Sequence, residues 1–163
     1  MAERSLRVDV VIPVYNEEKA LPGSIEQLDA FLTANCRHDW RIVIADNASV
    51  DRTPEVGRAL AARYPRLRYE RLERKGRGLA LRTAWLGSDA DILSYMDVDL
   101  STNLGAFVPM IESIATGGYH VAIGSRLRPG AQVKRQWKRE IVSRGYNLLV
   151  KLLFPLRRFS DAQ

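Results

Sequence analysis

Apolar runs alternate with helical patterns along the chain and predict an α/β fold. The predicted strands are residues 7–14, 41–45, 67–72, 92–96 and, as a shorter run, 121–123. The predicted helices are residues 21–32, 51–64, 78–86 and 104–115. Strands that are buried on both faces and separated by helices favour a doubly wound, Rossmann-like and mostly parallel sheet, flanked by helices.

Two carboxylates close the apolar run at residues 92–96, namely Asp97 and Asp99. An unpaired carboxylate is costly to bury. Two carboxylates at the point where the chain leaves a sheet can instead share a hard divalent cation, which takes oxygen ligands. A solvated turn or a helix cap is the plainer interpretation of an Asp-x-Asp sequence. The position behind an apolar run favours the metal site.

The chain length and the small numbers of cysteine and histidine limit the possible folds and chemistries. The chain of 163 residues is long enough for one sizeable core. Cys36 is the single cysteine, so an internal disulfide is excluded. His38 and His120 have no ligand or nucleophile partner at a useful spacing, which argues against zinc chemistry and Ser-His-Asp catalysis. Residues 1–7 carry charges but no apolar signal core, so we expect the chain to be cytoplasmic.

The positive charge is concentrated near the end of the chain. Residues 134–158 hold eight Lys and Arg against Glu140 alone, a charge of +7, whereas the whole chain has a net charge of +6. Apolar side chains are interleaved with these charges, which predicts a basic amphipathic helix at an anionic membrane surface or on phosphates. A helix packed on the core with a solvated basic edge is the alternative. Nucleic acid is disfavoured, because no second basic stripe exists.

These features predict a core at residues 1–133 and a basic segment of the same domain at residues 134–163. The membrane surface expected to meet the basic segment is the inner, cytoplasmic face. A homo-oligomer is the other expected partner for apolar surface exposed on this segment.

Polar clusters follow four of the predicted strands, at residues 13–18, 46–53, 74–78 and 97–99. Open parallel sheets bind ligands beyond the carboxyl ends of their strands, which is where all four clusters fall. Helix caps and turns could explain each cluster taken singly. Their convergence on one rim predicts a shared ligand site.

A sugar nucleotide fits the chemistry of this rim. Asp46 can hydrogen-bond the base or the ribose, and Arg77 with the backbone of the neighbouring glycines can approach the nucleotide. A cation on Asp99 can bridge two phosphate oxygens. A dinucleotide fingerprint after the first strand and a Walker lysine motif are both absent from the sequence. Dinucleotide redox chemistry and phosphoryl transfer from ATP therefore lack their expected motifs.

Five ordered motifs together resemble family 2 glycosyltransferases of the GT-A fold. The motifs are VIPVYNE at 11–17, DNASVDRT at 46–53, GRG at 76–78, DVD at 97–99 and GSR at 124–126. Within that family the chain is most similar to the polyprenyl-phosphate group, which includes dolichyl-phosphate mannose synthases and bacterial undecaprenyl-phosphate glucosyltransferases. The likeness extends from about residue 8 to the last residue.

The resemblance implies roles for particular residues. The implied nucleotide contacts are Pro13, Tyr15, Glu17, Asp46, Gly76, Arg77 and Asp97. Asp99 is implied as the main ligand of Mg²⁺ or Mn²⁺, with Ser101 as a further ligand where many relatives have glutamine. Arg126, Arg139 and Ser143 are implied to face the acceptor phosphate, and Arg139 and Ser143 share one face of a helix. Asp97, Asp99, Arg126 and Asp161 are implied as catalytic, with Asp161 orienting the acceptor or acting as base.

The implied reaction transfers a hexose from GDP-mannose or UDP-glucose to a polyprenyl or dolichyl phosphate, with inversion. The acceptor is already an anion and can attack without a general base. There are two alternatives. The chain could act on another acceptor, or it could bind a nucleotide or a lipid without turnover. A sugar-1-phosphate nucleotidyltransferase is disfavoured, because residues 13–17 contain no Gly-rich loop. Since family members continue past the point where this sequence ends, we expect the acceptor half and a membrane anchor to be truncated.

Overall fold

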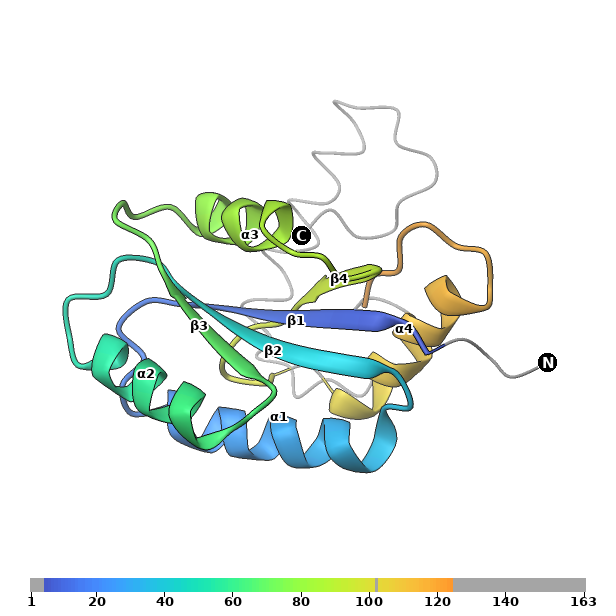
Figure 1. Ribbon diagram of the computed structural model, residues 1–163, viewed down its shortest axis with the longest axis horizontal. Coiled ribbons are helices and arrows are strands. Elements are labelled where there is room, and N and C mark those ends of the chain that lie inside the picture. Colours follow the sequence, from blue (N-terminus) through green and yellow to red (C-terminus); the bar gives the residue numbers. More distant parts are fainter. Residues whose placement is uncertain (1–4, 102, 125–163) are drawn as a thin grey trace, which may run out of the picture. The chain divides into compact units, whose positions relative to one another are not determined.

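The computed structural model describes residues 5–101 and 103–124. Four parallel strands form one sheet: β1 (Arg7–Val14), β2 (Asp39–Asp46), β3 (Leu67–Arg71) and β4 (Ile92–Tyr95). Their order is β3-β2-β1-β4 (Figure 1). In the register, Val14 lies opposite Asp46, and Asp46 lies opposite Arg71. The carboxyl ends of these three strands therefore meet at one edge of the sheet.

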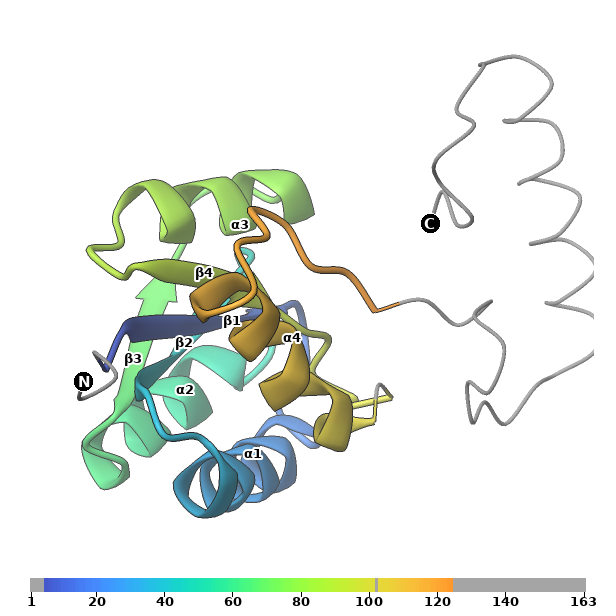
Figure 2. The same cartoon turned by 90° about the vertical axis from the view of Figure 1, so that its right-hand side faces the viewer.

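Helices cover both faces of the sheet and confirm the predicted α/β fold. They are α1 (Leu21–Asn35), α2 (Thr53–Arg63), α3 (Arg77–Leu86) and α4 (Phe107–Ala115), which follows a 3-10 turn, η1 (Leu104–Ala106). Figure 2 shows α3 on one side of the sheet and α1, α2 and α4 on the other. These elements all belong to the unit Met1–Ala122.

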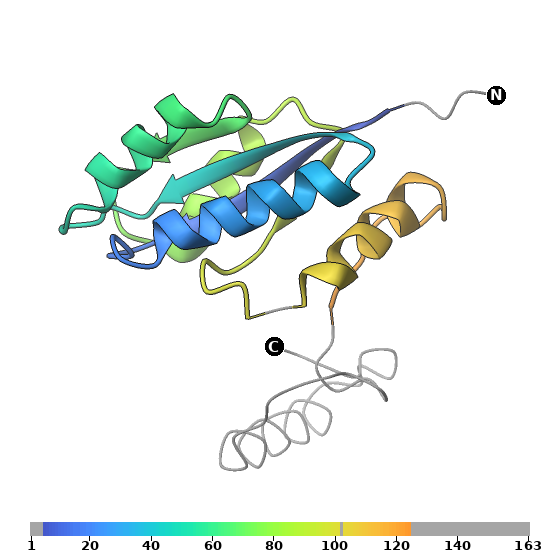
Figure 3. The same cartoon turned by 90° about the horizontal axis from the view of Figure 1, so that it is seen from below.

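The hydrophobic core has two layers because β1 and β2 are covered on both faces. The larger layer joins alternate residues of β1 to α1, α2 and α4, which lie in front of the sheet in Figure 3. The smaller layer lies under α3 and contains Val11, Val43 and Ala80. Burial on both faces explains the near-continuous apolar runs of these two strands.

The expectation that every strand is buried on both faces is wrong for the two edge strands of the described sheet, β3 and β4. Arg68 and Arg71 of β3 are exposed. Leu93 is 39% exposed and Tyr95 is 51% exposed. In the described part of the chain, β4 is an edge strand that pairs with β1 alone. Among the described helices, α3 packs mainly on β1 and β2. It meets β4 through Trp85, whose ring lies edge-on to that of Tyr95 with the ring centroids 5.9 Å apart.

The predicted strand at residues 121–123 is also wrong. These residues have no regular secondary structure, and Val121 and Ile123 are 74% and 63% exposed. A run of three apolar residues becomes a strand only where a neighbouring strand supplies hydrogen-bond partners. Within residues 5–101 and 103–124, no strand pairs with this run.

The basic segment falls outside the described residues, as does the predicted boundary at residue 133. Among the helices that are described, none has the length and hydropathy needed to cross a membrane.

Asp9 is a buried carboxylate inside the apolar β1, and its partners come from β2 and the turn before β4. Arg41 donates two hydrogen bonds to its oxygens, at 2.9 and 2.8 Å, and the Ser88 hydroxyl donates a third at 2.6 Å. Asp9 in turn raises the pKa of Arg41 through these hydrogen bonds. A buried charge is tolerated when it is paired and hydrogen-bonded, as it is here.

Glu112 of α4 accepts hydrogen bonds from the turn between α1 and β2. Arg37 donates to both of its carboxylate oxygens, at 2.9 and 2.6 Å. Nε2 of the buried His38 lies 3.2 Å from Oε1 of Glu112, although its direction is unsuited to a hydrogen bond. The hydrogen bonds from Arg37 lower the pKa of Glu112 from its ordinary 4.5.

Because this pKa is lowered by folding, the carboxylate of Glu112 stabilises the fold above pH 4.5, and this contribution is lost as the pH falls through the lowered value. The side chain is partly exposed, so Glu112→Gln should cost less than about 1 kcal/mol at neutral pH. The difference in unfolding free energy between wild type and variant should shrink with acid. Denaturant titrations between about pH 3 and pH 7 measure it. If the difference in unfolding free energy stays constant over this pH range, the stabilising role of the Glu112 carboxylate is contradicted. Glu26→Gln on α1 is the control for the loss of an exposed charge.

Candidate functional site

The four polar clusters leave neighbouring strands at one edge of the sheet. Backbone hydrogen bonds continue the ladder past the strand ends: Asn47 N–H donates to Val14 O at 2.9 Å, Leu72 N–H to Asp46 O at 2.8 Å, and Met96 N–H to Val11 O at 3.1 Å. The loops that follow β1, β2, β3 and β4 therefore start side by side. This is the position where open parallel sheets bind ligands.

Side-chain to backbone hydrogen bonds tie the loop after β1 to the loop after β2. The Ser49 hydroxyl accepts from Asn16 N–H at 3.0 Å, and the Asn16 amide oxygen accepts from Val50 N–H at 2.9 Å. The Thr53 hydroxyl accepts from Glu17 N–H at 2.8 Å. Asn16 and Ser49 thus connect two loops rather than cap their own helices. These hydrogen bonds join the two loops to each other.

Among the predicted site residues whose burial the structure describes, Asp46 is the most buried, with an exposed fraction of 0%. Its Oδ1 accepts from Ser49 N–H at 2.9 Å, and its Oδ2 accepts from the Tyr69 hydroxyl at 2.6 Å. Burial, followed by this hydrogen bond to Asp46, raises the pKa of Tyr69. Both carboxylate oxygens of Asp46 are engaged in holding the turn at residues 46–49. The contact of Asp46 with a base or ribose stays a prediction.

Two contacts bring the loop after β3 to the same edge. Gly76 N–H donates to the Asn47 amide oxygen at 2.5 Å. The Lys75 ammonium lies 3.7 Å from the centroid of the Tyr15 ring, within the range of a cation–π interaction. Sequence reasoning missed Asn47 and Lys75 as organising residues of the site. Their partners lie in other loops, 29 and 60 positions away along the chain, so no local pattern could reveal the contacts.

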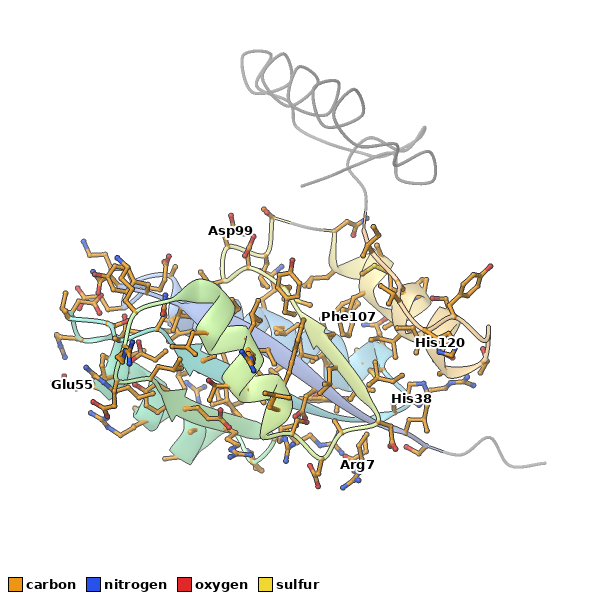
Figure 4. The ribbon with its side chains drawn as sticks, turned by 90° about the horizontal axis from the view of Figure 1, so that it is seen from above. Arg7, His38, Glu55, Asp99, Phe107 and His120 are labelled. Carbon is orange, nitrogen blue, oxygen red and sulfur yellow. The ribbon has the colours of Figure 1, made fainter. Side chains whose placement is uncertain are left out.

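The Asp-x-Asp pair lies on the loop that follows β4. Asp97 and Asp99 are exposed, and the buried Val98 between them anchors the loop to the core. Figure 4 shows Asp99 on the outer side of this loop. The Ser101 N–H donates to Oδ1 of Asp99 at 3.0 Å. Both carboxylates are therefore accessible to solvent.

The donor set of this loop fits a hard cation, because carboxylate and hydroxyl oxygens are what such ions prefer. Within the residues described, no group of three or more His, Cys, Asp or Glu side chains could enclose an ion. An ion held here would complete its coordination with phosphate and water oxygens, as Mg²⁺ commonly does.

Several residues at this edge of the sheet have a left-handed backbone conformation. In the described part of the chain, the non-glycine residues with positive φ are Asn16 (56°), Ala48 (59°) and Leu100 (45°), and each lies in a loop at a strand end. Such conformations cost about 1–3 kcal/mol each and persist where the surroundings determine them, which is common at functional sites. The hydrogen bonds between loops supply that constraint at Asn16 and Ala48.

The structure brings many of the predicted site residues to this edge. They are Pro13, Tyr15, Glu17, Asp46, Gly76, Asp97, Asp99 and Ser101. Arg77 is the first residue of α3, directly after Gly76. Arg126, Arg139, Ser143 and Asp161, predicted for the acceptor side, lie outside the described residues.

Curated relatives carry transferase names. Residues 9–161 match the family described as Glycosyl transferase family 2. Over 152 residues the chain is 36% identical to Glycosyltransferase AglD of Haloferax volcanii, covering 90% of this chain and 24% of that protein. Over 151 residues it is 30% identical to Dolichol-phosphate mannosyltransferase of Pyrococcus furiosus, covering 92% of this chain and 42% of that protein.

A solved structure has the same fold: the mannosyltransferase PcManGT from Pyrobaculum calidifontis, in complex with GDP-Man and Mn2+. Its TM-score is 0.55 at 26% identity, covering 67% of this chain and 32% of that one. The chain spans about a quarter to two fifths of the length of the two curated relatives above. The match over residues 9–161, together with the shared fold, confirms the predicted family and GT-A fold. The chain belongs to glycosyl transferase family 2.

Proposed function

We propose that this domain transfers a hexose from a nucleotide diphosphate sugar to a polyprenyl phosphate. The observation that carries the proposal is the arrangement of the exposed Asp97 and Asp99 beside the joined loops after β1 and β2, at one edge of a parallel sheet. The relative from P. furiosus is named for dolichol phosphate, and the structural neighbour was solved with GDP-Man. These names support the donor and acceptor classes.

The donor nucleotide is assigned to the loops after β1, β2 and β3. Tyr15 offers a half-buried aromatic ring on which a base or ribose can pack, and Glu17 offers a carboxylate for hydroxyl groups. Lys75, held over the Tyr15 ring, would supply a positive charge to the nucleotide phosphates. Pro13, Gly76 and Arg77 complete the proposed nucleotide contacts, with GDP and UDP as the candidate nucleotides.

Asp99, with Ser101, would hold Mg²⁺ or Mn²⁺, and Asp97 would orient the donor. A divalent ion on these oxygens would neutralise the diphosphate as it leaves. Mn2+ in the structural neighbour supports a divalent metal. Since the Ser101 N–H already fixes one oxygen of Asp99, the carboxylate is oriented before any ligand arrives.

The acceptor is assigned to residues beyond the described part of the chain. Arg126, Arg139 and Ser143 would bind its phosphate, and Asp161 would orient it, close to the cytoplasmic face of a membrane. A phosphate oxygen attacks the anomeric carbon, a new carbon–oxygen bond forms, and the bond to the diphosphate breaks as the nucleoside diphosphate leaves. A single displacement of this kind inverts the anomeric configuration. The acceptor is already an anion, so no protein base is required for the attack.

The proposal predicts that the chain binds either GDP or UDP, with an affinity that rises when Mg²⁺ or Mn²⁺ is added. Calorimetric titration of each nucleotide, with and without metal, measures this directly. Transfer is tested with radiolabelled GDP-mannose and UDP-glucose and a short polyprenyl phosphate. The product should be a glycosyl phosphate lipid of inverted configuration. Failure of both nucleotides to bind would overturn the proposed function.

A further inference from the structure

A hydrogen bond from β3 holds the buried carboxylate of Asp46. The Tyr69 hydroxyl donates to Oδ2 at 2.6 Å, the length of a strong charge-assisted hydrogen bond. Asp46 is wholly buried, whereas Tyr69 is half-buried. Removing a partner from a buried charged group leaves that group unsatisfied and costs more than an ordinary hydrogen bond. Tyr69 is thus bound tightly to a residue of the candidate site, although no sequence motif singled it out.

Gly57 of α2 makes room for the Tyr69 ring. A Cβ atom at position 57 would overlap the ring atoms Cδ2 and Cε2 of Tyr69. Glycine inside a helix costs about 1 kcal/mol relative to alanine, so its presence in α2 calls for a compensating reason. The place of the Tyr69 ring supplies that reason. Arg58 lies over the same ring, 5.9 Å from its centroid.

The Tyr69–Asp46 bond reaches the loop after β1 in two further steps. Asp46 accepts from Ser49 N–H, and the Ser49 hydroxyl accepts from Asn16 N–H. Arg71, two residues after Tyr69 on β3, donates to Ser49 O at 3.1 Å. Two side chains of β3 therefore hold the turn after β2, and that turn holds Asn16, which lies between Tyr15 and Glu17.

We infer that Tyr69 is a positioning residue of the nucleotide site, acting through Asp46, and that Gly57 is required to seat it. The inference rests on the proposed function only in taking the ligand to be a nucleoside diphosphate. Tyr69 holds the Asp46 carboxylate and so sets the shape of the joined loops that meet the ligand. We therefore expect the Tyr69 hydroxyl to affect nucleotide affinity, in addition to any effect that Tyr69 has on the stability of the fold.

Tyr69→Phe tests this, because it removes the hydroxyl and leaves the ring on Gly57. Affinity for GDP or UDP, whichever the wild type binds, should fall about tenfold, because the Asp46 carboxylate is no longer held by this hydroxyl and the loops that meet the ligand shift with it. Calorimetry is performed with saturating Mg²⁺, well below the unfolding temperature. Tyr64→Phe is the matched control: it makes the same chemical change at the end of α2, and affinity should be unchanged.

Gly57→Ala breaks the same bond without altering either partner, since its methyl group displaces the Tyr69 ring. It should weaken nucleotide binding by a similar factor. The double variant Gly57→Ala/Tyr69→Phe should bind no more weakly than the weaker single variant, because both changes remove one interaction. Additive losses would contradict a shared route through Asp46.

The outcomes separate this inference from the proposed function. If the wild type binds neither nucleotide, the proposed function fails and the inference fails with it. If the wild type binds and Tyr69→Phe binds equally well, the inference alone is overturned. A purely structural role would give that second result together with a lower unfolding midpoint, which thermal denaturation of the same samples measures.

Discussion

Asp99→Ala is expected to reduce metal-dependent nucleotide affinity by about 100-fold, because it removes the carboxylate proposed as the main ligand of the divalent ion. Affinity measured with a chelator should change little, since the loops after β1 and β2 stay intact. The measurement is calorimetric titration of GDP and UDP with Mg²⁺, with Mn²⁺ and with EDTA. Asp99 is exposed on its loop, so the variant should fold as the wild type does.

Asp39→Ala is the control for this experiment. Asp39 is also an exposed aspartate, at the start of β2 and therefore at the opposite end of the strands from Asp99. Its loss removes the same charge and should leave metal-dependent affinity unchanged. If Asp99→Ala retains the full effect of metal on nucleotide binding, the assignment of the ion to the loop after β4 is wrong.

The largest expected effect on stability follows Arg41→Met, which leaves the buried Asp9 carboxylate without its bidentate partner. Breaking a buried ion pair costs about 3–5 kcal/mol, and we expect about 2–4 kcal/mol here because Arg41 is itself one-third exposed. The Ser88 hydroxyl remains as a partner of Asp9 and limits the loss. Urea titration followed by circular dichroism gives the change in unfolding free energy.

Arg68→Met provides the comparison, since Arg68 forms an exposed ion pair with Glu70 and its loss should cost less than about 1 kcal/mol. The double variant Asp9→Val/Arg41→Met should recover much of the stability, because apolar replacement of both members of a buried pair is often neutral. Equal losses in Arg41→Met and Arg68→Met would show that burial of Asp9 does not govern the effect.

Much of the secondary structure was predictable because each element is defined by a local pattern. The run at residues 7–14 is β1, and the helical spacing of Leu21, Ile25 and Leu28 is α1. The errors fall at the border of the sheet. Whether Leu93 is covered, or whether residues 121–123 find a partner strand, depends on which elements pack alongside, and an apolar run alone carries no information about its neighbours.

The candidate site was predictable in its position and much less so in its internal contacts. Parallel strands bring their carboxyl ends to one edge, so the clusters after β1, β2, β3 and β4 had to converge once the strands were identified. The Tyr69 hydroxyl on Asp46 and the Lys75 ammonium on Tyr15 join residues 23 and 60 positions apart in sequence. Contacts of this kind depend on register and packing, which the motifs do not encode.

Sequence alone determined the family, the α/β class and the edge of the sheet at which the polar residues meet, since these depend on local periodicity and ordered motifs. Only the tertiary structure decided the environment of each side chain at that edge. In the folded chain Asp46 is buried and its carboxylate accepts two hydrogen bonds, whereas Asp97 and Asp99 are exposed to solvent. The physical reason is that all three are aspartates at strand ends, and their different environments arise from the neighbours that folding brings to them.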